Sequence, residues 1–517
     1  MKIEFLGQAG LFIEENNSKL LCDPWVSESG GFLARWHQYP PNMNLDLEKI
    51  KKTDYLYISH SHRDHFDREF LKDFSEDIPF FIANYVSKKF IHEIEEIGFK
   101  NIIELNNWEK YQLNDDLAIT LIKEPTLYKD DSTLIVESKK NKIFNKNDCY
   151  LSPEIMDELS QIHFDIIFSQ FSGAMHYPII YNYPKSKKDE ISKNICNYLI
   201  DQFIKNTNQL ETNYVVPSAG PPCFLEDDCF EFNFKENGIF PDQNDIIPDL
   251  TNSLNTKFNL MQPGDTVTLD GDEISFNNNH SFDFSKKKEL LLEYKKIRLP
   301  KIQNYLQSIP EPPENLYEKF TQTIKNFAKK NSYITSQIGQ LVEFNIKGIH
   351  GGVWQIDFRN GMPVFYQQAK ALPQYRFNLE GKLLNLVCDE RISWEELFLS
   401  LRITAERDPD LYNWPLFALL RYGHDKTLLD LIQKDEQEKN EKGESITIKN
   451  NGKDVVIQRY CPHNGEDLKS ACIENGVLTC SRHNWKFDLN NNGKCTFGGN
   501  KDLKIFQKKD IMNNDDE

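Results

Sequence analysis

The segment Ile58–His65 carries three histidines and one aspartate within six residues, directly after an apolar run that is typical of a buried strand. The chain has 12 histidines in 517 residues, so this density argues against ordinary surface histidines on a loop. Side chains at positions i and i+2 of an extended segment point to the same side, and His60 and His62 can therefore reach one metal ion. The turn that follows brings Asp64 and His65 toward a neighbouring ion. The pattern predicts a metal centre at the end of a buried strand, with a spacing suited to a pair of ions.

The His-x-His-x-Asp-His pattern is the motif of the metallo-β-lactamase fold, and the short strands predicted ahead of it also resemble that fold. The resemblance implies that Asp23 orients one of the motif histidines from behind the metal. The alternative is a turn residue before proline. The resemblance also implies that Asp148, at the end of a predicted strand, bridges the two ions, the alternative being a loop aspartate. Asp64, His65 and Asp148 are then the candidate catalytic residues.

One ligand of the family is missing from its expected place. No histidine lies between His92 and His163, where the family supplies its usual third ligand for the first ion. The oxygen donors in that window are Glu124, Tyr128 and Asp130. His176 is the candidate for a final ligand, the alternative being an ordinary polar histidine. The site is therefore expected to hold one or two ions, bound by His60, His62, Asp64, His65, Asp148 and His176.

Two pairs of cysteine and histidine lie near the C-terminus. Cys461-Pro462-His463 is followed, after sixteen residues, by Cys480-Ser481-Arg482-His483. Four such ligands can hold one metal ion, and zinc is the first alternative. The surrounding residues instead match the two cluster loops of Rieske proteins, in which two cysteines hold one iron and two histidines hold the other. Cys461, His463, Cys480 and His483 are thus expected to bind a [2Fe-2S] cluster for one-electron transfer.

The two Rieske-like loops lack one feature of the respiratory type. Gly465-Glu466 and Ser481-Arg482 stand where respiratory Rieske proteins carry an additional cysteine pair. The region therefore resembles the oxygenase or ferredoxin type, which passes electrons to a partner site. Hydrolysis moves no electrons, so a Rieske domain favours iron over zinc at the N-terminal site. Histidine and carboxylate ligands with open positions suit Fe(II) and O₂, and we expect O₂ as a co-substrate.

The combination resembles the CMP-N-acetylneuraminate hydroxylases, which join a Rieske domain to a metallo-β-lactamase-like domain. Patches along most of the chain carry the resemblance: Asp23-Pro24-Trp25, Ala34-Arg35-Trp36, Asn147-Asp148-Cys149, Phe171-Ser172-Gly173-Ala174, Arg407-Asp408-Pro409-Asp410 and His483-Asn484-Trp485-Lys486. The family carries the Rieske domain first, whereas here it comes last. The chain is therefore expected to be a relative with swapped domain order.

The resemblance implies an iron-dependent hydroxylase. Its cluster would accept electrons from an external donor (a ferredoxin, a cytochrome b5-like protein or a flavin reductase) and pass them to a non-haem iron. The substrate would be a nucleotide sugar or another N-acylated sugar, hydroxylated on the N-acyl methyl, or an amine that is N-oxygenated. Arg35 and the Tyr39-Pro40-Pro41 loop would line the pocket, because an arginine suits a phosphate or carboxylate. A surface arginine is the alternative.

Two other functions compete with the hydroxylase. The first is a metal-dependent hydrolase with zinc at the N-terminal site, in which the Rieske domain senses the redox state. The second is a non-enzymatic electron carrier whose N-terminal domain is a binding scaffold. Four ligands within six residues argue against a scaffold. The identity of the metal separates the hydroxylase from the hydrolase.

Composition narrows the choice of partners. Asp plus Glu number 79 and Lys plus Arg number 61, which gives a net charge of −18. A surface this acidic argues against non-specific binding to nucleic acid or to an anionic membrane. No apolar run approaches the ~20 residues that span a bilayer, and Glu4 interrupts the stretch where a signal peptide would be apolar. The sequence predicts a cytoplasmic protein with a small-molecule substrate, and it leaves a homo-oligomer open.

The expected fold class is α/β. Four parts are predicted: a metallo-β-lactamase-like αββα sandwich over residues 1–290, a helical and α+β accessory region over 291–432, a charged linker over 433–444 and an all-β Rieske domain over 445–510. The linker is predicted because almost every residue in it is charged or polar. The accessory region resembles sterol-carrier-like modules, and a structural or dimerisation module is the preferred alternative.

Overall fold

The computed structural model describes residues 1–173, 175–234, 240–278, 282–441, 445–462, 467–480, 485–499 and 501–506. The chain divides into two compact units. The first consists of Met1–Met175 and Leu199–Ile309, and the second of His176–Tyr198 and the chain from Pro310 onward. Within the described residues, no helix is both long enough and apolar enough to cross a membrane.

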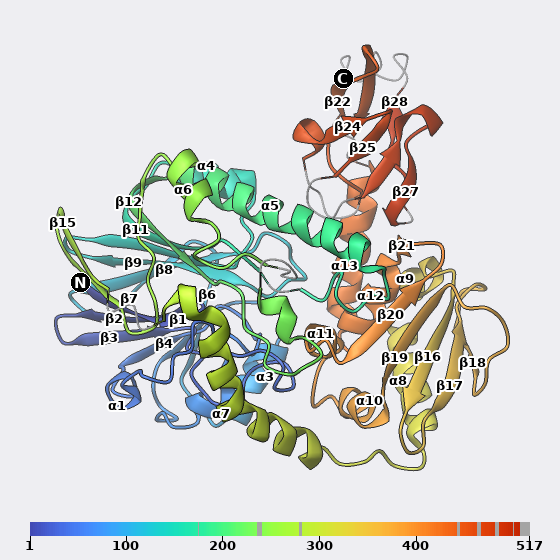
Figure 1. The fold of residues 1–517 in the computed structure, drawn as a ribbon, viewed down its shortest axis with the longest axis horizontal. Helices are drawn as coiled ribbons and strands as arrows, with labels where there is room; N and C mark the ends of the chain where they lie inside the picture. Colours follow the sequence, from blue (N-terminus) through green and yellow to red (C-terminus); the bar gives the residue numbers. More distant parts are fainter. Residues whose placement is uncertain are drawn as a thin grey trace. The chain divides into compact units, whose positions relative to one another are not determined.

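Two β-sheets form the centre of the first unit (Figure 1). One sheet has the order β15-β14-β1-β2-β3-β4-β5-β6. Its strands are β1 (Lys2–Gly7), β2 (Gly10–Glu15), β3 (Ser18–Cys22), β4 (Tyr55–Tyr57), β5 (Phe80–Ala83), β6 (Ile102–Leu105), β14 (Thr266–Asp270) and β15 (Glu273–Asn277). The other sheet has the order β13-β12-β11-β10-β9-β8-β7. Its strands are β7 (Glu109–Gln112), β8 (Leu117–Lys123), β9 (Ser132–Ser138), β10 (Lys142–Asn147), β11 (His163–Gln170), β12 (Glu211–Ser218) and β13 (Lys257–Phe258).

Burial explains why these segments stack into two layers. Strands β3, β4, β5 and β6 pair in parallel, and such strands are buried on both faces and read as continuous apolar runs. Leu20–Cys22 and Phe80–Ala83 are runs of this kind, and each of their residues is buried. Their side chains share one core with Leu134 and Phe168 of the facing sheet.

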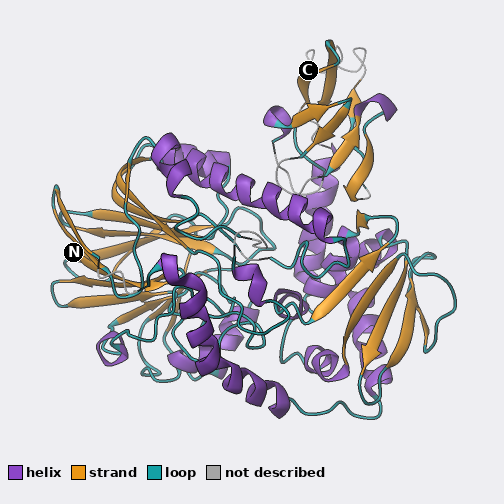
Figure 2. Cartoon of the chain, in the orientation of Figure 1, coloured by secondary structure: helices purple, strands orange, loops and turns teal. Residues whose placement is uncertain are grey.

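Helices cover the outer faces of the two sheets, which completes the predicted αββα sandwich (Figure 2). The first sheet is covered by α1 (Leu47–Ile50), α2 (Arg68–Leu71) and α3 (Lys89–Glu96), and the second by α4 (Pro153–Leu159), α6 (Ile247–Ser253) and the later part of α5 (Lys185–Gln209). Helix α7 (Lys287–Ser308) buries Leu291, Tyr294 and Ile302 against a smaller cluster that includes Cys223 and Leu225.

The ends of three strands position the predicted metal ligands. Strand β3 ends directly before Asp23, β4 ends before the loop that carries His60 to His65, and β10 ends directly before Asp148. Parallel pairing of β3 with β4 places the first two strand ends side by side. The sandwich therefore brings residues that are distant in sequence to one edge of the two sheets.

The second unit contains a mixed sheet with the order β18-β17-β16-β19-β20. Its strands are β16 (Leu341–Lys347), β17 (Gly352–Asp357), β18 (Val364–Tyr366), β19 (Tyr375–Glu380) and β20 (Ile403–Arg407). Its helices are α8 (Leu316–Lys330), α9 (Ser332–Gln337), α10 (Gly381–Cys388), α11 (Trp394–Leu399), α12 (Trp414–Tyr422) and α13 (Lys426–Glu441). Pro310, Pro312 and Pro313 lie between α7 and α8.

The C-terminal part of the second unit is all-β, as predicted. One sheet consists of β22 (Ser445–Asn450), β23 (Lys453–Gln458) and β28 (Ile505–Phe506). The other consists of β24 (Cys472–Glu474), β25 (Val477–Thr479), β26 (Lys486–Asp488) and β27 (Lys494–Gly499). Strand β21 (Leu411–Tyr412) of the accessory region pairs with β27 and extends this second sheet.

The predicted charged linker differs in the structure, because α13 continues through it as far as Glu441. The helix is anchored at its start by Leu428, Leu429 and Ile432, which are buried. Lys434 pairs with Glu438 at 3.7 Å, one helical turn further on. Lysine and glutamate are good helix formers, so their composition is as compatible with a surface helix as with a linker. Residues 442–444 lie outside the described part of the chain.

Candidate metal centre

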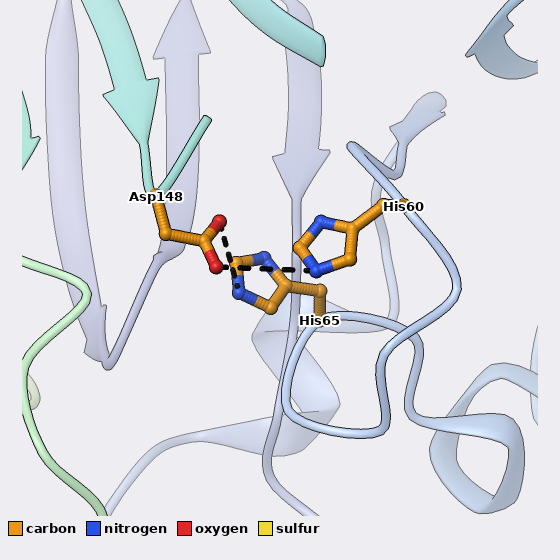
Figure 3. Close-up of side chains that lie close together, drawn as sticks. All are labelled: His60, His65 and Asp148. Atoms are coloured by element: carbon orange, nitrogen blue, oxygen red, sulfur yellow. Dashed lines mark ion pairs between the residues drawn. The ribbon is translucent and has the colours of Figure 1, made fainter. Parts of the chain in front are cut away.

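His60, His65 and Asp148 form a group whose ligand atoms all lie within 4.8 Å of one another (Figure 3). Nε2 of His65 is 3.5 Å from Oδ1 of Asp148, and Nε2 of His60 is 3.9 Å from Oδ2 of the same carboxylate. Both histidines are buried, whereas Asp148 keeps 23% of its side chain exposed. The group combines the loop after β4 with the end of β10, and one of its ligands faces solvent.

A carboxylate stands behind each of the two histidines. Oδ2 of Asp23 is 3.2 Å from Nδ1 of His65, and Oδ1 of Asp131 is 3.3 Å from Nδ1 of His60. Ser59 Oγ lies between them, 3.0 Å from Nδ1 of His60 and 3.2 Å from Nδ1 of His65. Partners on Nδ1 fix the ring orientation and direct Nε2 to a metal ion. Asp131 contacts His60 in the same way that Asp23 contacts His65, so the orienting role expected for Asp23 applies equally to Asp131.

The carboxylates outweigh the effect of burial on the imidazoles. Burial lowers the pKa of His60, but Asp131 and Asp148 raise it to about 9. Burial also lowers the pKa of His65, and neighbouring carboxylates, Asp148 first, raise it to about 10. Burial raises the pKa of Asp148, whereas His65 and His60 lower it to about 2. A bound cation takes the place of the imidazole protons, since histidine ligates metal in its neutral form.

The buried polar atoms of the site fit a metal ion. Among the described residues, Nε2 of His65, Oδ1 of Asp64 and Oδ1 of Asp148 are buried without a hydrogen-bond partner. Such atoms are uncommon in proteins and point to a missing ion or water. Imidazole nitrogens with carboxylate oxygens form a donor set that binds non-haem iron or zinc. The residues therefore fit an ion of either kind.

His62 and Asp64 flank the three-residue group. Nδ1 of His62 is 2.9 Å from Nε2 of His60, the nitrogen that faces Asp148. Oδ2 of Asp64 is 3.9 Å from Nε2 of His65 and accepts a hydrogen bond from Nε2 of Gln8 at 3.3 Å. Both residues thus lie beside the group, and their ligand roles stay predictions.

The oxygen donors named from the sequence lie outside the group. These are Glu124, Tyr128 and Asp130. Glu124 is buried and lies 3.7 Å from the ammonium of Lys129. Sequence reasoning missed Asp131, whose only signal is its place in a tandem of aspartates directly before β9. It also missed Gln8, which lies in the turn between β1 and β2 and is part of no metal-binding motif.

His176 belongs to the second unit and is not among the residues that the structure groups around a metal. Its imidazole stacks on Phe417 with ring centroids 6.0 Å apart and lies 5.3 Å from the ring of Phe398. Burial, assisted by Arg421, lowers its pKa to about 3. The aromatic packing of His176 explains its position without a metal.

Arg35 is buried among acidic residues of its own chain. Its guanidinium lies 2.7 Å from Asp228 and 3.1 Å from Glu226. These partners occupy the positions that a phosphate or carboxylate of a substrate would take, so the predicted substrate contact gains no support from the geometry. Tyr39 and Pro40 of the neighbouring loop do line a small cavity beside Gln8.

Left-handed backbone conformations gather around the metal centre. Gln8, Asp23 and Asn147 have φ of 53°, 42° and 45°. Phe32, Leu33 and Ala34 are consecutive left-handed residues, and the Phe32 ring meets His62 edge-on at 5.9 Å. Each such residue costs ~1–3 kcal/mol and persists only where the surroundings impose it. Strain of this kind clusters at functional sites.

The two predicted cluster cysteines lie in one hydrophobic core of the C-terminal part. Cys461 and Cys480 are 3% and 2% exposed, and neither is in a disulfide. The backbone N–H of Cys480 donates to the carbonyl of Trp485 at 2.8 Å. His463 and His483, the other two predicted ligands, lie outside the described residues.

Comparison with known domains agrees with both predicted domain types. Residues 2–166 match the beta-lactamase superfamily domain, and residues 428–506 match the Rieske [2Fe-2S] domain. The fold and the site therefore define a protein with an N-terminal metallo-β-lactamase fold and a C-terminal Rieske domain. The second match contains all four predicted ligands of the [2Fe-2S] cluster.

Relatives fall into two groups. A protein of Mycolicibacterium smegmatis, named for its Rieske 2Fe-2S iron–sulfur character, is 28% identical over 522 residues, or 96% of this chain and 98% of the relative. Cytidine monophosphate-N-acetylneuraminic acid hydroxylase of Xenopus laevis is 27% identical over 156 residues, or 29% of this chain and 26% of the hydroxylase. The predicted resemblance to these hydroxylases, in swapped domain order, is confirmed.

Solved structures resemble the N-terminal half only loosely. An isothiocyanate hydrolase from Delia radicum gut bacteria is 17% identical with a TM-score of 0.38. The match covers 52% of this chain and 100% of the hydrolase. CmlA, a diiron beta-hydroxylase from Streptomyces venezuelae, is 15% identical with a TM-score of 0.31, and the match covers 42% of this chain and 44% of CmlA. At TM-scores this low, neither structure bears on the function.

Proposed function

We propose that the chain is an oxygenase of the hydroxylase type, in which the Rieske cluster supplies electrons to a non-haem iron held by His60, His65 and Asp148. One atom of O₂ enters the substrate and the other leaves as water, with the uptake of two electrons and two protons. A Rieske cluster carries one electron at a time, so an external donor reduces it twice per turnover. A ferredoxin, a cytochrome b5-like protein or a flavin reductase fits this task.

One observation carries the proposal. Two histidines held from behind by Asp23 and Asp131 direct Nε2 toward Asp148, in a chain that also carries a Rieske domain. A hydrolase uses a metal-bound water but no electrons, and it leaves electron transfer by the Rieske domain without a task. An electron carrier leaves the oriented ligands without one. An oxygenase uses both the oriented metal ligands and the Rieske domain.

The residues of the chain hold and shield the metal, while the iron supplies the activation of oxygen. Asp23 and Asp131 keep Nδ1 of the two histidines engaged, which leaves Nε2 for the ion. Burial of both rings limits the access of bulk water to these ligands. Asp148 is the partly exposed member of the group, and its side is where a substrate approaches.

The proposed substrate is an N-acylated or amine-bearing small molecule, with nucleotide sugars as the first class to test. The support is the name of the vertebrate relatives, which are hydroxylases of a nucleotide-linked N-acylated sugar. The match covers about a quarter of the Xenopus protein, so the class is a starting point for a screen. The product gains the mass of one oxygen atom.

Metal analysis with EPR tests the proposal. Wild-type protein, a His60→Ala/His65→Ala variant and a His92→Ala control are expressed with iron supplied and then reduced with dithionite. His92 is an exposed histidine of α3 that pairs with Glu95 on the same helix. We expect iron beyond the two atoms of the cluster in wild type and control. The double variant loses the additional iron and keeps the Rieske signal.

Zinc at the N-terminal site beside an intact Rieske signal would contradict the oxygenase. The same result would favour the metal-dependent hydrolase, and phosphodiesters and lactones would then be screened before sugars. Loss of the Rieske signal in the double variant would show unfolding, and the melting temperature of each variant therefore accompanies the metal analysis.

A further inference from the structure

A small cavity lies next to the metal centre, within the first unit. Its apolar wall includes Phe5, Phe171 and Phe284, and its polar wall consists of Gln8, Ser218 and Gln243. The space in it that a water-sized molecule can occupy is about 10 Å³. Gln8 joins it to the metal centre, because its Nε2 donates to Oδ2 of Asp64 at 3.3 Å.

Three polar atoms on the cavity wall lack a partner. In the described part of the chain, Oε1 of Gln8, Oγ of Ser218 and Oε1 of Gln243 are buried without a hydrogen bond. The three residues are 7%, 2% and 7% exposed. Leaving a buried donor or acceptor unpaired carries a desolvation penalty, and three such atoms around one cavity indicate that something binds there.

Hydrogen bonds show which end of each amide is left without a partner. Nε2 of Gln243 donates to the carbonyls of Pro217 and Met261, at 3.2 and 3.0 Å, so its Oε1 is the acceptor that remains. Nε2 of Gln8 donates to Asp64, and its Oε1 remains in the same way. The cavity therefore presents two acceptors and one hydroxyl, which can donate or accept.

We propose that one water molecule occupies this cavity, donating to Oε1 of Gln8 and Oε1 of Gln243 and accepting from the hydroxyl of Ser218. The two O–H donors of the water and one of its acceptor positions give each of the three atoms a hydrogen-bond partner. The size agrees, since a single water needs about 10–15 Å³ and buried waters make about three hydrogen bonds. An ammonium ion also offers donors, but it brings an uncompensated charge between apolar walls.

The water makes Gln8 a positioning residue for the metal centre. With the water bound, the amide of Gln8 is held at both ends, by Asp64 on Nε2 and by the water on Oε1. The carboxylate of Asp64, whose Oδ2 also lies 3.9 Å from Nε2 of His65, is thereby fixed. The inference deepens the proposed site and rests on a metal ion at Asp64, whether that ion is iron or zinc.

A high-resolution crystal structure of the full chain tests the water directly. We expect a density peak about 2.7–3.2 Å from each of the three atoms. In a Gln8→Met variant, which keeps the length of the side chain but not its polar end, the peak weakens or disappears. An empty cavity in the wild type, or a protein side chain at that place, would overturn the proposal.

Metal affinity tests the positioning role. Fe²⁺ affinity is measured anaerobically by competition with a chelator, and Zn²⁺ affinity is measured in parallel. Gln8→Met lowers both by ~10-fold or more, as expected for residues that orient metal ligands. The control Gln161→Met, at an exposed position, changes neither. If the oxygenase proposal fails because the ion is zinc, the Zn²⁺ arm still decides this inference.

Melting temperatures show whether the variants fold. Should Gln8→Met not fold, Ser218→Ala replaces it, since this change removes one hydroxyl and keeps the strand. Its crystal structure then shows a weaker water peak, and the metal affinity falls by less than in a Gln8 variant. Wild-type affinity together with an unchanged peak in the substituted proteins would refute the link between the water and Asp64.

Discussion

At the scale of single residues, the metal centre depends on carboxylates that face away from the metal. Asp23 and Asp131 each contact the Nδ1 atom of a histidine, at 3.2 and 3.3 Å. Without them a buried imidazole loses its preferred orientation. The two carboxylates are therefore as important for metal binding as the ligands themselves.

Replacing Asp131 tests this dependence. Asp131→Ala leaves Nδ1 of His60 without its carboxylate, and we expect the N-terminal metal to bind ~10–100-fold more weakly. The measurement is chelator competition on the folded protein. Asp115→Ala, at an exposed aspartate, is the control and keeps wild-type affinity. Equal affinity in the two variants would show that Asp131 does not orient His60.

The two metal centres are expected to be independently loaded. Cys461→Ser removes a predicted cluster ligand from the core of the C-terminal part and abolishes the Rieske EPR signal. Iron at the N-terminal site stays, because none of the residues around His60 and His65 belongs to that core. Loss of both metals would contradict independent centres. Hydroxylation stops in this variant, whereas hydrolysis would continue.

The sequence allows the prediction of ligands that form a dense local pattern, and not of those that depend on the fold. His60, His65 and Asp148 are predictable, because strand ends and metal-binding side chains coincide there. Asp131 is not, since its neighbour Asp130 has the same chemistry and only the path of the chain into β9 decides which one faces His60. A solitary glutamine such as Gln8 carries no signal at all.

At the scale of helices and strands, apolar runs in the sequence predicted strands reliably. Polar segments did not predict loops reliably. The strands β1, β2, β3, β8 and β9 are rich in apolar residues and were predictable. Helix α5 is polar over much of its length, and α13 ends in a charged segment that indicates a linker. The packing of these two helices depends on a few buried apolar residues, such as Phe203 and Leu429. A mainly polar composition makes such residues hard to recognise in the sequence.

Close packing around Trp485 gives a test at this scale. A Cβ added to Gly499 would overlap the indole of Trp485, so Gly499→Ala displaces that ring from the core that also holds Cys461 and Cys480. We expect the C-terminal part to lose ~1–3 kcal/mol of stability and the cluster to be released at a lower temperature. Visible absorption during thermal unfolding measures this, with Asn491→Ala, an exposed position, as the control. Unchanged release would show that Trp485 does not support the cluster.

At the scale of the whole molecule, the chain joins a metallo-β-lactamase-fold domain to a Rieske domain. The candidate metal ligands lie in the first unit and the predicted cluster cysteines in the second. A relative of nearly the same length matches through 98% of its chain, so the two domains occur together beyond this protein. Their combination is what an oxygenase requires, since electrons must reach the metal while substrate is bound.

The most direct test of the central claim follows electrons out of the cluster. Protein reduced with dithionite and freed of excess reductant is mixed with O₂, and the Rieske EPR signal is followed by freeze-quenching in wild type and in His60→Ala/His65→Ala. We predict that the signal decays quickly in wild type and persists in the variant, because the metal centre consumes the electrons. Equal decay in the two proteins would mean that the cluster does not serve the N-terminal metal, and it would contradict the account.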